Sequence, residues 1–128
     1  MGETKILVIE DEEEARRIIT RCLNRKGYST FSTATAREGI KLARIEHPNI
    51  TLLDIRLADG SGFDVLKEIK KLDKNMQVII VTALNDETTI HKAKTLGVDD
   101  YLTKPLTVDF LDNLVLEKIA ELSLRKKI

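Results

Sequence analysis

The sequence predicts an α/β domain in which helices surround a parallel β-sheet. Short apolar runs alternate five times with amphipathic segments of helix length, and no repeat, low-complexity segment or linker interrupts them. Strands that alternate with helices favour βαβ units and hence a parallel sheet. At 128 residues the chain has the length of one domain, which we expect to span 1–128 with a core from about residue 5 to residue 122.

Five segments have the composition of strands, and their polarity suggests an order in the sheet. The segments 6–9, 50–53 and 78–81 are continuous apolar runs, which are typical of strands buried on both faces. The segments 28–32 and 98–102 contain more polar residues, so we expect them at the edges. With right-handed crossovers the predicted order is 2-1-3-4-5, the doubly wound, flavodoxin-like arrangement in which ligands bind at the carboxyl ends of strands one and three.

Five further segments carry apolar residues at the spacing of one helix face. The first two are expected at about 12–26 and 35–46. The second ends before Pro48, because proline disfavours an α conformation in the residue that precedes it. The other three are predicted to follow Gly62, to follow Asn85, and to run from Val108 to Leu122.

The composition argues against several classes of protein. Lys plus Arg and Asp plus Glu number 21 each, so the net charge favours neither nucleic acid nor an anionic membrane. The basic tail 125–127 is interpreted as cations at a helix carboxyl terminus, where the helix dipole favours them. No apolar stretch approaches the roughly 20 residues of a membrane span. The single cysteine, Cys22, excludes an internal disulfide and has the spacing of a core residue, so we expect a cytoplasmic protein without direct nucleic-acid or membrane binding.

Polar side chains stand at the ends of four predicted strands. Glu10 and Asp11 follow the first strand, Asp54 follows the third, Thr82 ends the fourth, and Lys104 comes shortly after the fifth. Carboxylate oxygens are the ligands that Mg²⁺ prefers, whereas a hydroxyl and an ammonium are suited to phosphoryl oxygens. The predicted chemistry is phosphoryl transfer to or from a carboxylate.

Most of these residues also have a purely structural interpretation. Asp11 could cap the first helix, and the acids after it would interact favourably with the helix dipole. Asp54 could cap a turn, although Asp59 is the better turn residue by composition. Thr82 could be an ordinary strand end and Lys104 a solvated loop residue. The agreement of four strand ends at one side of a sheet favours a functional site instead.

These motifs make the chain similar to the receiver domains of two-component response regulators, a family that includes the chemotaxis response regulator. The resemblance covers the chain from Lys5 to about Leu122. It rests on four segments, namely Glu10-Asp11-Glu12 after an apolar strand, residues 53–57, residues 81–83 and residues 97–105.

The resemblance implies roles for the acids. Asp54 would be the phosphoacceptor and a member of the Mg²⁺ site, where Asp11 would bind the ion directly and Glu10 through water. The backbone carbonyl of Arg56 would complete the protein's share of the metal ligands.

The resemblance also implies a switch and its partners. Thr82 and Lys104 would hold the phosphoryl group, Tyr101 would be an aromatic switch, and a cis bond before Pro105 would aim Lys104 inward. The donor would be a sensor histidine kinase or a phosphotransfer protein. An output protein or domain would bind the surface of the fourth helix, fifth strand and fifth helix, which could also pair two copies of the chain. The protein would then be a regulatory switch rather than an enzyme, with intrinsic self-phosphorylation and autodephosphorylation.

Three residues depart from the family pattern in the loop after Asp54. The family often has a proline at the position of Ala58. It often has an apolar residue at the position of Gly60 and an acid at the position of Ser61. We therefore expect a looser loop with different partner contacts.

Two other functions on a related fold stay open at this point. A free-standing phosphoester hydrolase with Asp54 as nucleophile would need a second acid two residues later, where this chain has Arg56. A flavin carrier would need backbone donors in the loop after the first strand, where this chain has acids.

Overall fold

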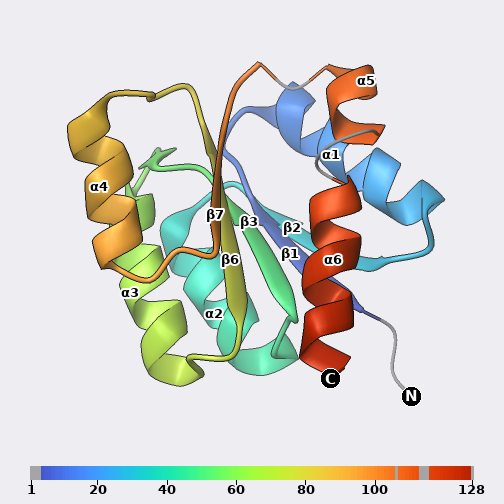
Figure 1. Cartoon of the computed structure of the whole chain (residues 1–128), viewed down its shortest axis with the longest axis horizontal. Helices are drawn as coiled ribbons and strands as arrows, with labels where there is room; N and C mark the ends of the chain where they lie inside the picture. Colours follow the sequence, from blue (N-terminus) through green and yellow to red (C-terminus); the bar gives the residue numbers. More distant parts are fainter. Residues whose placement is uncertain (1–3, 106, 113–115, 128) are drawn as a thin grey trace.

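The computed structural model describes residues 4–105, 107–112 and 116–127, and its main feature is a five-stranded parallel sheet. The sheet order is β2-β1-β3-β6-β7 (Figure 1). Its members are β1 (Lys5–Ile9), β2 (Ser29–Thr33), β3 (Ile50–Leu53), β6 (Gln77–Thr82) and β7 (Asp100–Thr103). These are the five predicted strands in chain order, so the predicted order and the flavodoxin-like class are confirmed.

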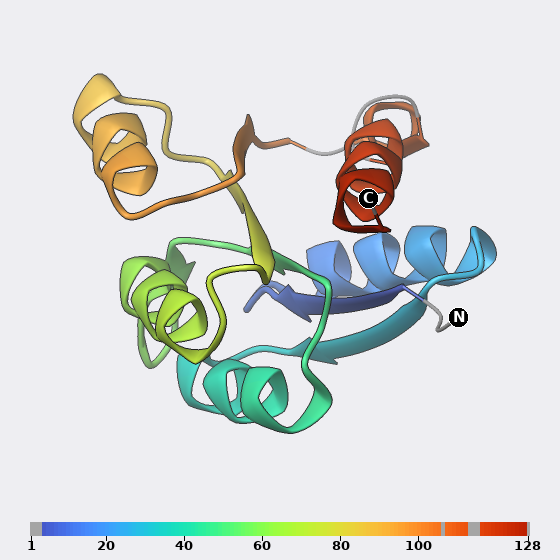
Figure 2. The ribbon, with the colours of Figure 1, turned by 60° about the horizontal axis from the view of Figure 1, so that its bottom comes forward.

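Helices cover both faces of the sheet (Figure 2). On one side lie α1 (Glu13–Arg25), α5 (Val108–Phe110) and α6 (Leu116–Lys127), and on the other α2 (Ala36–Glu46), α3 (Gly62–Leu72) and α4 (Glu87–Thr95). The fifth predicted helix is thus described as two segments, α5 and α6, and residues 113–115 between them lie outside the described residues. None of the described helices is long and apolar enough to cross a membrane.

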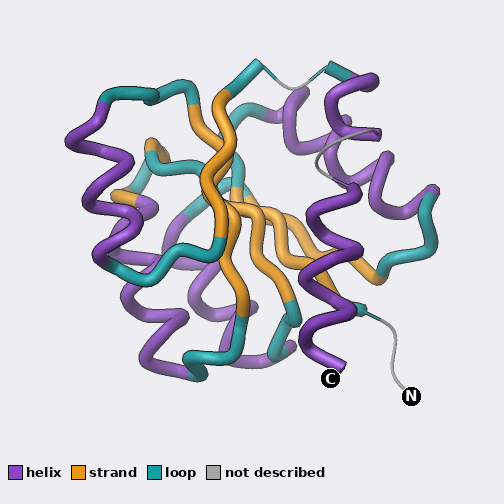
Figure 3. The backbone as a smooth tube through the Cα atoms, in the orientation of Figure 1, coloured by secondary structure: helices purple, strands orange, loops and turns teal. Residues whose placement is uncertain are grey.

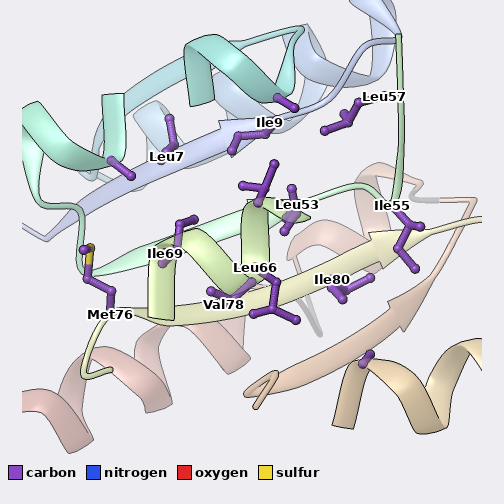
Figure 4. Packing of buried hydrophobic residues seen from close by; sticks show 14 residues of the cluster. Leu7, Ile9, Leu53, Ile55, Leu57, Leu66, Ile69, Met76, Val78 and Ile80 are labelled. Atoms are coloured by element: carbon purple, nitrogen blue, oxygen red, sulfur yellow. The ribbon is translucent and has the colours of Figure 1, made fainter. Parts of the chain in front are cut away.

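Alternate residues of the buried strands pack against the two helix layers. Ile6 and Val8 of β1 join the cluster beneath α1 and α6, whereas Leu7 and Ile9 join the cluster beneath α2 and α3 (Figure 4). Cys22 is buried in the first of these clusters, as its helical spacing predicts. The strands therefore have no polar face, which explains their continuous apolar runs.

One predicted core position is wrong. Val108, the first apolar residue of the fifth predicted helix, is 51% exposed, whereas Leu111, Ile119 and Leu122 of that predicted helix are buried. In the structure Val108 begins the short helix α5, which ends at Phe110, rather than the continuous helix that the spacing predicts.

A small antiparallel hairpin follows Asp54 and was not predicted. It consists of β4 (Arg56–Leu57) and β5 (Gly60–Ser61), and Figure 3 draws it in orange apart from the central sheet. The hairpin returns the chain to Gly62, whose N–H donates to the carbonyl of Ile55 at 2.6 Å. A Cβ at Gly62 would overlap the backbone carbonyl of Asp54, so the hairpin can fold this closely only around glycine.

Candidate functional site

Three acids converge at the carboxyl ends of β1 and β3, which lie toward the top of Figure 1. The parallel register pairs Ile9 with Leu53, so the residues that follow these strands stand side by side. One carboxylate oxygen from each of Glu10, Asp11 and Asp54 lies within 4.8 Å of the others. Glu10 and Asp54 are 2% and 7% exposed, while Asp11 is open to solvent.

Lys104 brings an ammonium group into this cluster from the end of β7. Its Nζ lies 2.8 Å from Asp54 Oδ2, 2.5 Å from Glu10 Oε1 and 3.1 Å from Glu12 Oε1. The Lys104-Pro105 peptide bond is cis, as the resemblance implied. Burial alone would lower the pKa of Lys104, but its hydrogen bonds to Asp54 and Glu10 outweigh burial and raise the pKa well above its ordinary value.

Glu10 is held as a buried acid at the end of β1. Burial raises its pKa above 4.5, although the hydrogen bonds from Lys104 and from the Glu12 N–H act to lower it. The Glu12 N–H donates to Glu10 Oε2 at 3.1 Å, and Arg16 donates to the Glu10 backbone carbonyl at 2.8 Å. The protein therefore fixes this carboxylate firmly at a position where its charge is costly.

The structure does not support the interpretation of Asp11 as a helix cap. Helix α1 begins at Glu13, and the cap position belongs to Glu12, whose side chain makes no capping hydrogen bond. The Asp11 carboxylate belongs instead to the cluster with Glu10 and Asp54.

Thr82, at the end of β6, and Tyr101 of β7 both form hydrogen bonds with the backbone of Leu84 in the loop after β6. Thr82 is 1% exposed, and its hydroxyl oxygen accepts a long hydrogen bond from the Leu84 N–H at 3.5 Å. The half-buried Tyr101 donates its hydroxyl proton to the Leu84 carbonyl at 2.5 Å. Burial, and then the negative charges of Asp86 and Asp54, raise the pKa of Tyr101, so its hydroxyl remains a donor.

Arg56 presents its backbone, not its side chain, to the site. Its N–H donates to Asp54 Oδ1 at 3.3 Å, while its side chain is exposed. Pro105 is also exposed, and its link to the cluster is the cis peptide bond that joins it to Lys104.

Two residues near the site escaped the sequence prediction. The sequence predicts only that a helix follows Gly62, yet this residue packs against the Asp54 backbone. Asp59 does lie in a turn as predicted, but its carboxylate also accepts the N–H groups of Ala36 and Arg37. A glycine three residues before the apolar stripe that begins at Val65 is a usable signal, whereas nothing local in the sequence links Asp59 to residues 22 and 23 positions away.

The donor atoms of the cluster suit a hard cation. Among the described residues this is the one group of three or more His, Cys, Asp and Glu side chains close enough to hold a metal ion, and all three members offer oxygen. Mg²⁺ prefers oxygen ligands and is usually bound by one or two carboxylates while it keeps several waters. Two buried carboxylates and one open to solvent fit that preference.

Solved structures of the same fold include receiver proteins. A response regulator receiver domain protein from Methanospirillum hungatei is 28% identical, with a TM-score of 0.87, and covers 97% of this chain and 99% of that one. A two-component response regulator from Clostridium difficile is 27% identical, with a TM-score of 0.88 and coverage of 96% and 98%.

Curated relatives agree with the structures. Sporulation initiation phosphotransferase F of Bacillus subtilis is 31% identical over 115 residues, which are 90% of this chain and 93% of that protein. The chain is 36% identical to a probable transcriptional regulator of Porphyridium aerugineum but spans only 44% of that protein. It is 31% identical to the regulatory protein AtoC of Escherichia coli and spans 26% of it. The profile of the response regulator receiver domain matches residues 6–116. The chain therefore belongs to the family of response regulator receiver domains.

Proposed function

We propose that this chain is the phosphoacceptor of a two-component signalling system and accepts a phosphoryl group on Asp54. The observation that carries the proposal is the convergence of a lysine ammonium and two further acids on the buried carboxylate of Asp54. The donor would be the phosphohistidine of a sensor histidine kinase or of a phosphotransfer protein. The name of the Bacillus subtilis relative, a phosphotransferase, supports this class of chemistry.

Four groups of this chain would hold Mg²⁺, namely the carboxylates of Glu10, Asp11 and Asp54 and the backbone carbonyl of Arg56. The family resemblance supports contact through water for Glu10. A bound Mg²⁺ supplies positive charge that offsets the repulsion between the carboxylates and the incoming phosphoryl oxygens. The oxygen-only donor set and its compactness support this assignment.

The transfer is an in-line displacement at phosphorus. One carboxylate oxygen of Asp54 forms the new P–O bond while the P–N bond to the donor histidine breaks, and the histidine nitrogen keeps the bonding electrons. Lys104 would exchange a hydrogen bond to Asp54 for one to a phosphoryl oxygen, and Thr82 would donate its hydroxyl proton to another. The raised pKa of Lys104 keeps its ammonium protonated in the unphosphorylated protein.

The output step would pass through Thr82, Leu84 and Tyr101. An acyl phosphate brings about two negative charges to the site and would draw the Thr82 hydroxyl toward Asp54. Leu84 is hydrogen-bonded to both Thr82 and Tyr101, so a movement of Thr82 would reach Tyr101 through this loop. The surface formed by α4, β7 and the α5–α6 segment would then change its affinity for an output partner or for a second copy of the chain.

The phosphoacceptor assignment can be tested with Mg²⁺ and acetyl phosphate as donor. Intact mass spectrometry should show one added phosphoryl group on the wild type and none on Asp54→Asn. Asp99→Asn, which makes the same acid-to-amide change at the opposite end of the sheet, should be phosphorylated like the wild type. An acid- and base-labile phosphate on Asp54→Asn at the wild-type level would overturn the assignment.

The switch can be tested with beryllium fluoride, which stands in for the acyl phosphate on Asp54. Backbone amide resonances outside the site should change most in α4 and β7, including Ile90, Lys94 and Tyr101. Changes concentrated in α2, or partner binding that stays equally phosphate-dependent in Tyr101→Ala, would contradict this path.

A further inference from the structure

Asp59 connects the loop that follows Asp54 to the start of α2. Its Oδ1 accepts the Ala36 N–H at 2.6 Å, and its Oδ2 accepts the Arg37 N–H at 3.1 Å. These hydrogen bonds lower the pKa of Asp59, so the carboxylate is ionised at neutral pH. Both oxygens are therefore engaged with the backbone of another element.

Helix α2 already has a cap of its own. Thr35 occupies the cap position, and its hydroxyl oxygen accepts the Glu38 N–H at 3.2 Å. Ala36 and Arg37 are the first two residues of the helix, and their N–H groups are among those that have no partner within a helix. Asp59 thus serves the same helix end as Thr35, but from a hairpin turn 23 residues after Ala36 in the chain.

The anchored turn belongs to the hairpin that carries Arg56. Ala58 and Asp59 form the two-residue turn between β4 and β5, and the hairpin pairs Arg56 with Ser61. Where the hairpin begins, the Arg56 N–H donates to the Asp54 carboxylate, and where it ends, Gly62 packs against the Asp54 carbonyl. A shift of the turn would therefore be passed to the backbone of Arg56 and to the Asp54 loop.

We propose that Asp59 is a positioning residue for the phosphorylation site, which holds the β4–β5 turn against α2 and so fixes the backbone of Arg56. This inference rests on the proposed function, in which the Arg56 carbonyl is a ligand of Mg²⁺. It also bears on the loop after Asp54, which the departures at Ala58, Gly60 and Ser61 predict to be looser than in the family. The constraint comes from the Asp59 carboxylate instead.

The matched test compares Asp59→Ala with Thr35→Ala. Each variant removes one cap from the same end of α2, so both should melt at a lower temperature than the wild type. Asp59→Ala should weaken binding of Mg²⁺ alone by about tenfold, the lower end of what outer-shell partners contribute, because it acts through the backbone. Thr35→Ala should leave Mg²⁺ affinity close to the wild-type value. Equal weakening in the two variants would reduce Asp59 to a helix cap and overturn the proposal.

A second variant separates geometry from charge. Asp59→Asn loses the negative charge but keeps an oxygen that can accept one of the two N–H groups. Its Mg²⁺ affinity should lie nearer to the wild type than to Asp59→Ala. Equal losses in Asp59→Asn and Asp59→Ala would assign the effect to long-range charge.

A measurement without metal distinguishes this inference from the proposed function. In metal-free protein, the backbone amide resonance of Arg56 should shift in Asp59→Ala and stay in place in Thr35→Ala. An Arg56 resonance that does not move would overturn the positioning role alone. A wild-type protein that neither binds Mg²⁺ nor is phosphorylated on Asp54 would overturn the proposed function, whatever Asp59 does.

Discussion

At each end of the central sheet a lysine contacts a carboxylate, but the two ends differ in the number of acids that surround the lysine. At the amino end, Lys70 of α3 lies 2.9 Å from Asp99 and also donates to the Met76 carbonyl at 2.8 Å. Asp99 accepts the Val78 N–H at 2.7 Å as well. One cation there meets one anion, and the remaining hydrogen bonds go to backbone groups.

At the carboxyl end, one ammonium meets several acids. Lys104 pairs with Glu10, Glu12 and Asp54 at once, which leaves an excess of two negative charges before Asp11 is counted. Arg16 reaches the same region but donates to a backbone carbonyl rather than to a carboxylate.

We interpret the difference as that between an ion pair that stabilises the fold and one that belongs to the proposed phosphorylation site. The pair at the amino end ties α3 to β6 and β7 and needs no other partner. The acids at the carboxyl end repel one another and are partly buried, so their charge is costly until another cation arrives. This excess of buried charge of one sign supports the proposal that the carboxyl end of the sheet is the functional one.

The largest expected contrast is between the two lysines. Lys104→Met should lower the free energy of unfolding of the metal-free protein by about 3 kcal/mol, because it leaves buried carboxylates without a partner. Lys70→Met should cost about 1 kcal/mol, as for a partly exposed pair. Urea denaturation in EDTA and in Mg²⁺ measures both, and Mg²⁺ should recover much of the loss in Lys104→Met alone. Similar losses in the two variants, unaffected by Mg²⁺, would break the comparison.

A smaller contrast is expected between two exposed acids. Asp11→Asn should weaken Mg²⁺ binding by about tenfold and raise the melting temperature of the metal-free protein, because it removes a ligand and a source of repulsion. Asp99→Asn should lower the melting temperature and leave Mg²⁺ affinity unchanged. Calorimetric titration with Mg²⁺ and thermal melting in EDTA give the two quantities. A metal-free melting temperature that falls in Asp11→Asn would favour a structural role for Asp11.

The smallest expected effect is on the pH dependence of stability. The pKa of folded Glu10 is raised above its ordinary value of 4.5, so between that value and the raised pKa the folded protein binds more protons than the unfolded chain. The free energy of unfolding should therefore decrease as pH rises through this window, by up to about 1.4 kcal/mol for each unit of the shift. The lowered pKa values of Asp59 and Asp86 act below pH 3.8, outside the window.

Glu10→Gln is the variant that checks this assignment. Urea denaturation in EDTA at several pH values should show a flatter profile for Glu10→Gln than for the wild type. Parallel profiles for the two proteins would assign the dependence to other groups.

The sequence could predict the part of the site that depends on strand ends. Continuous apolar runs placed β1 and β3 inside the sheet, and a parallel sheet brings the residues after those strands to one side, so Glu10 and Asp54 had to converge. The same pattern could not predict contacts between elements that are far apart along the chain. Asp59 binds the start of α2, 23 positions earlier in the chain, and Lys70 binds Asp99, 29 positions later. Asp59, Lys70 and Asp99 are all residue types that are ordinary at a protein surface.

A titration of the metal-free protein with Mg²⁺, followed by backbone amide resonances, tests the difference between the two ends most directly. We expect saturable shifts at Glu10, Asp11, Asp54 and Arg56 and none at Lys70 or Asp99. No saturable shift at the carboxyl end, or shifts of equal size at both ends, would contradict the account.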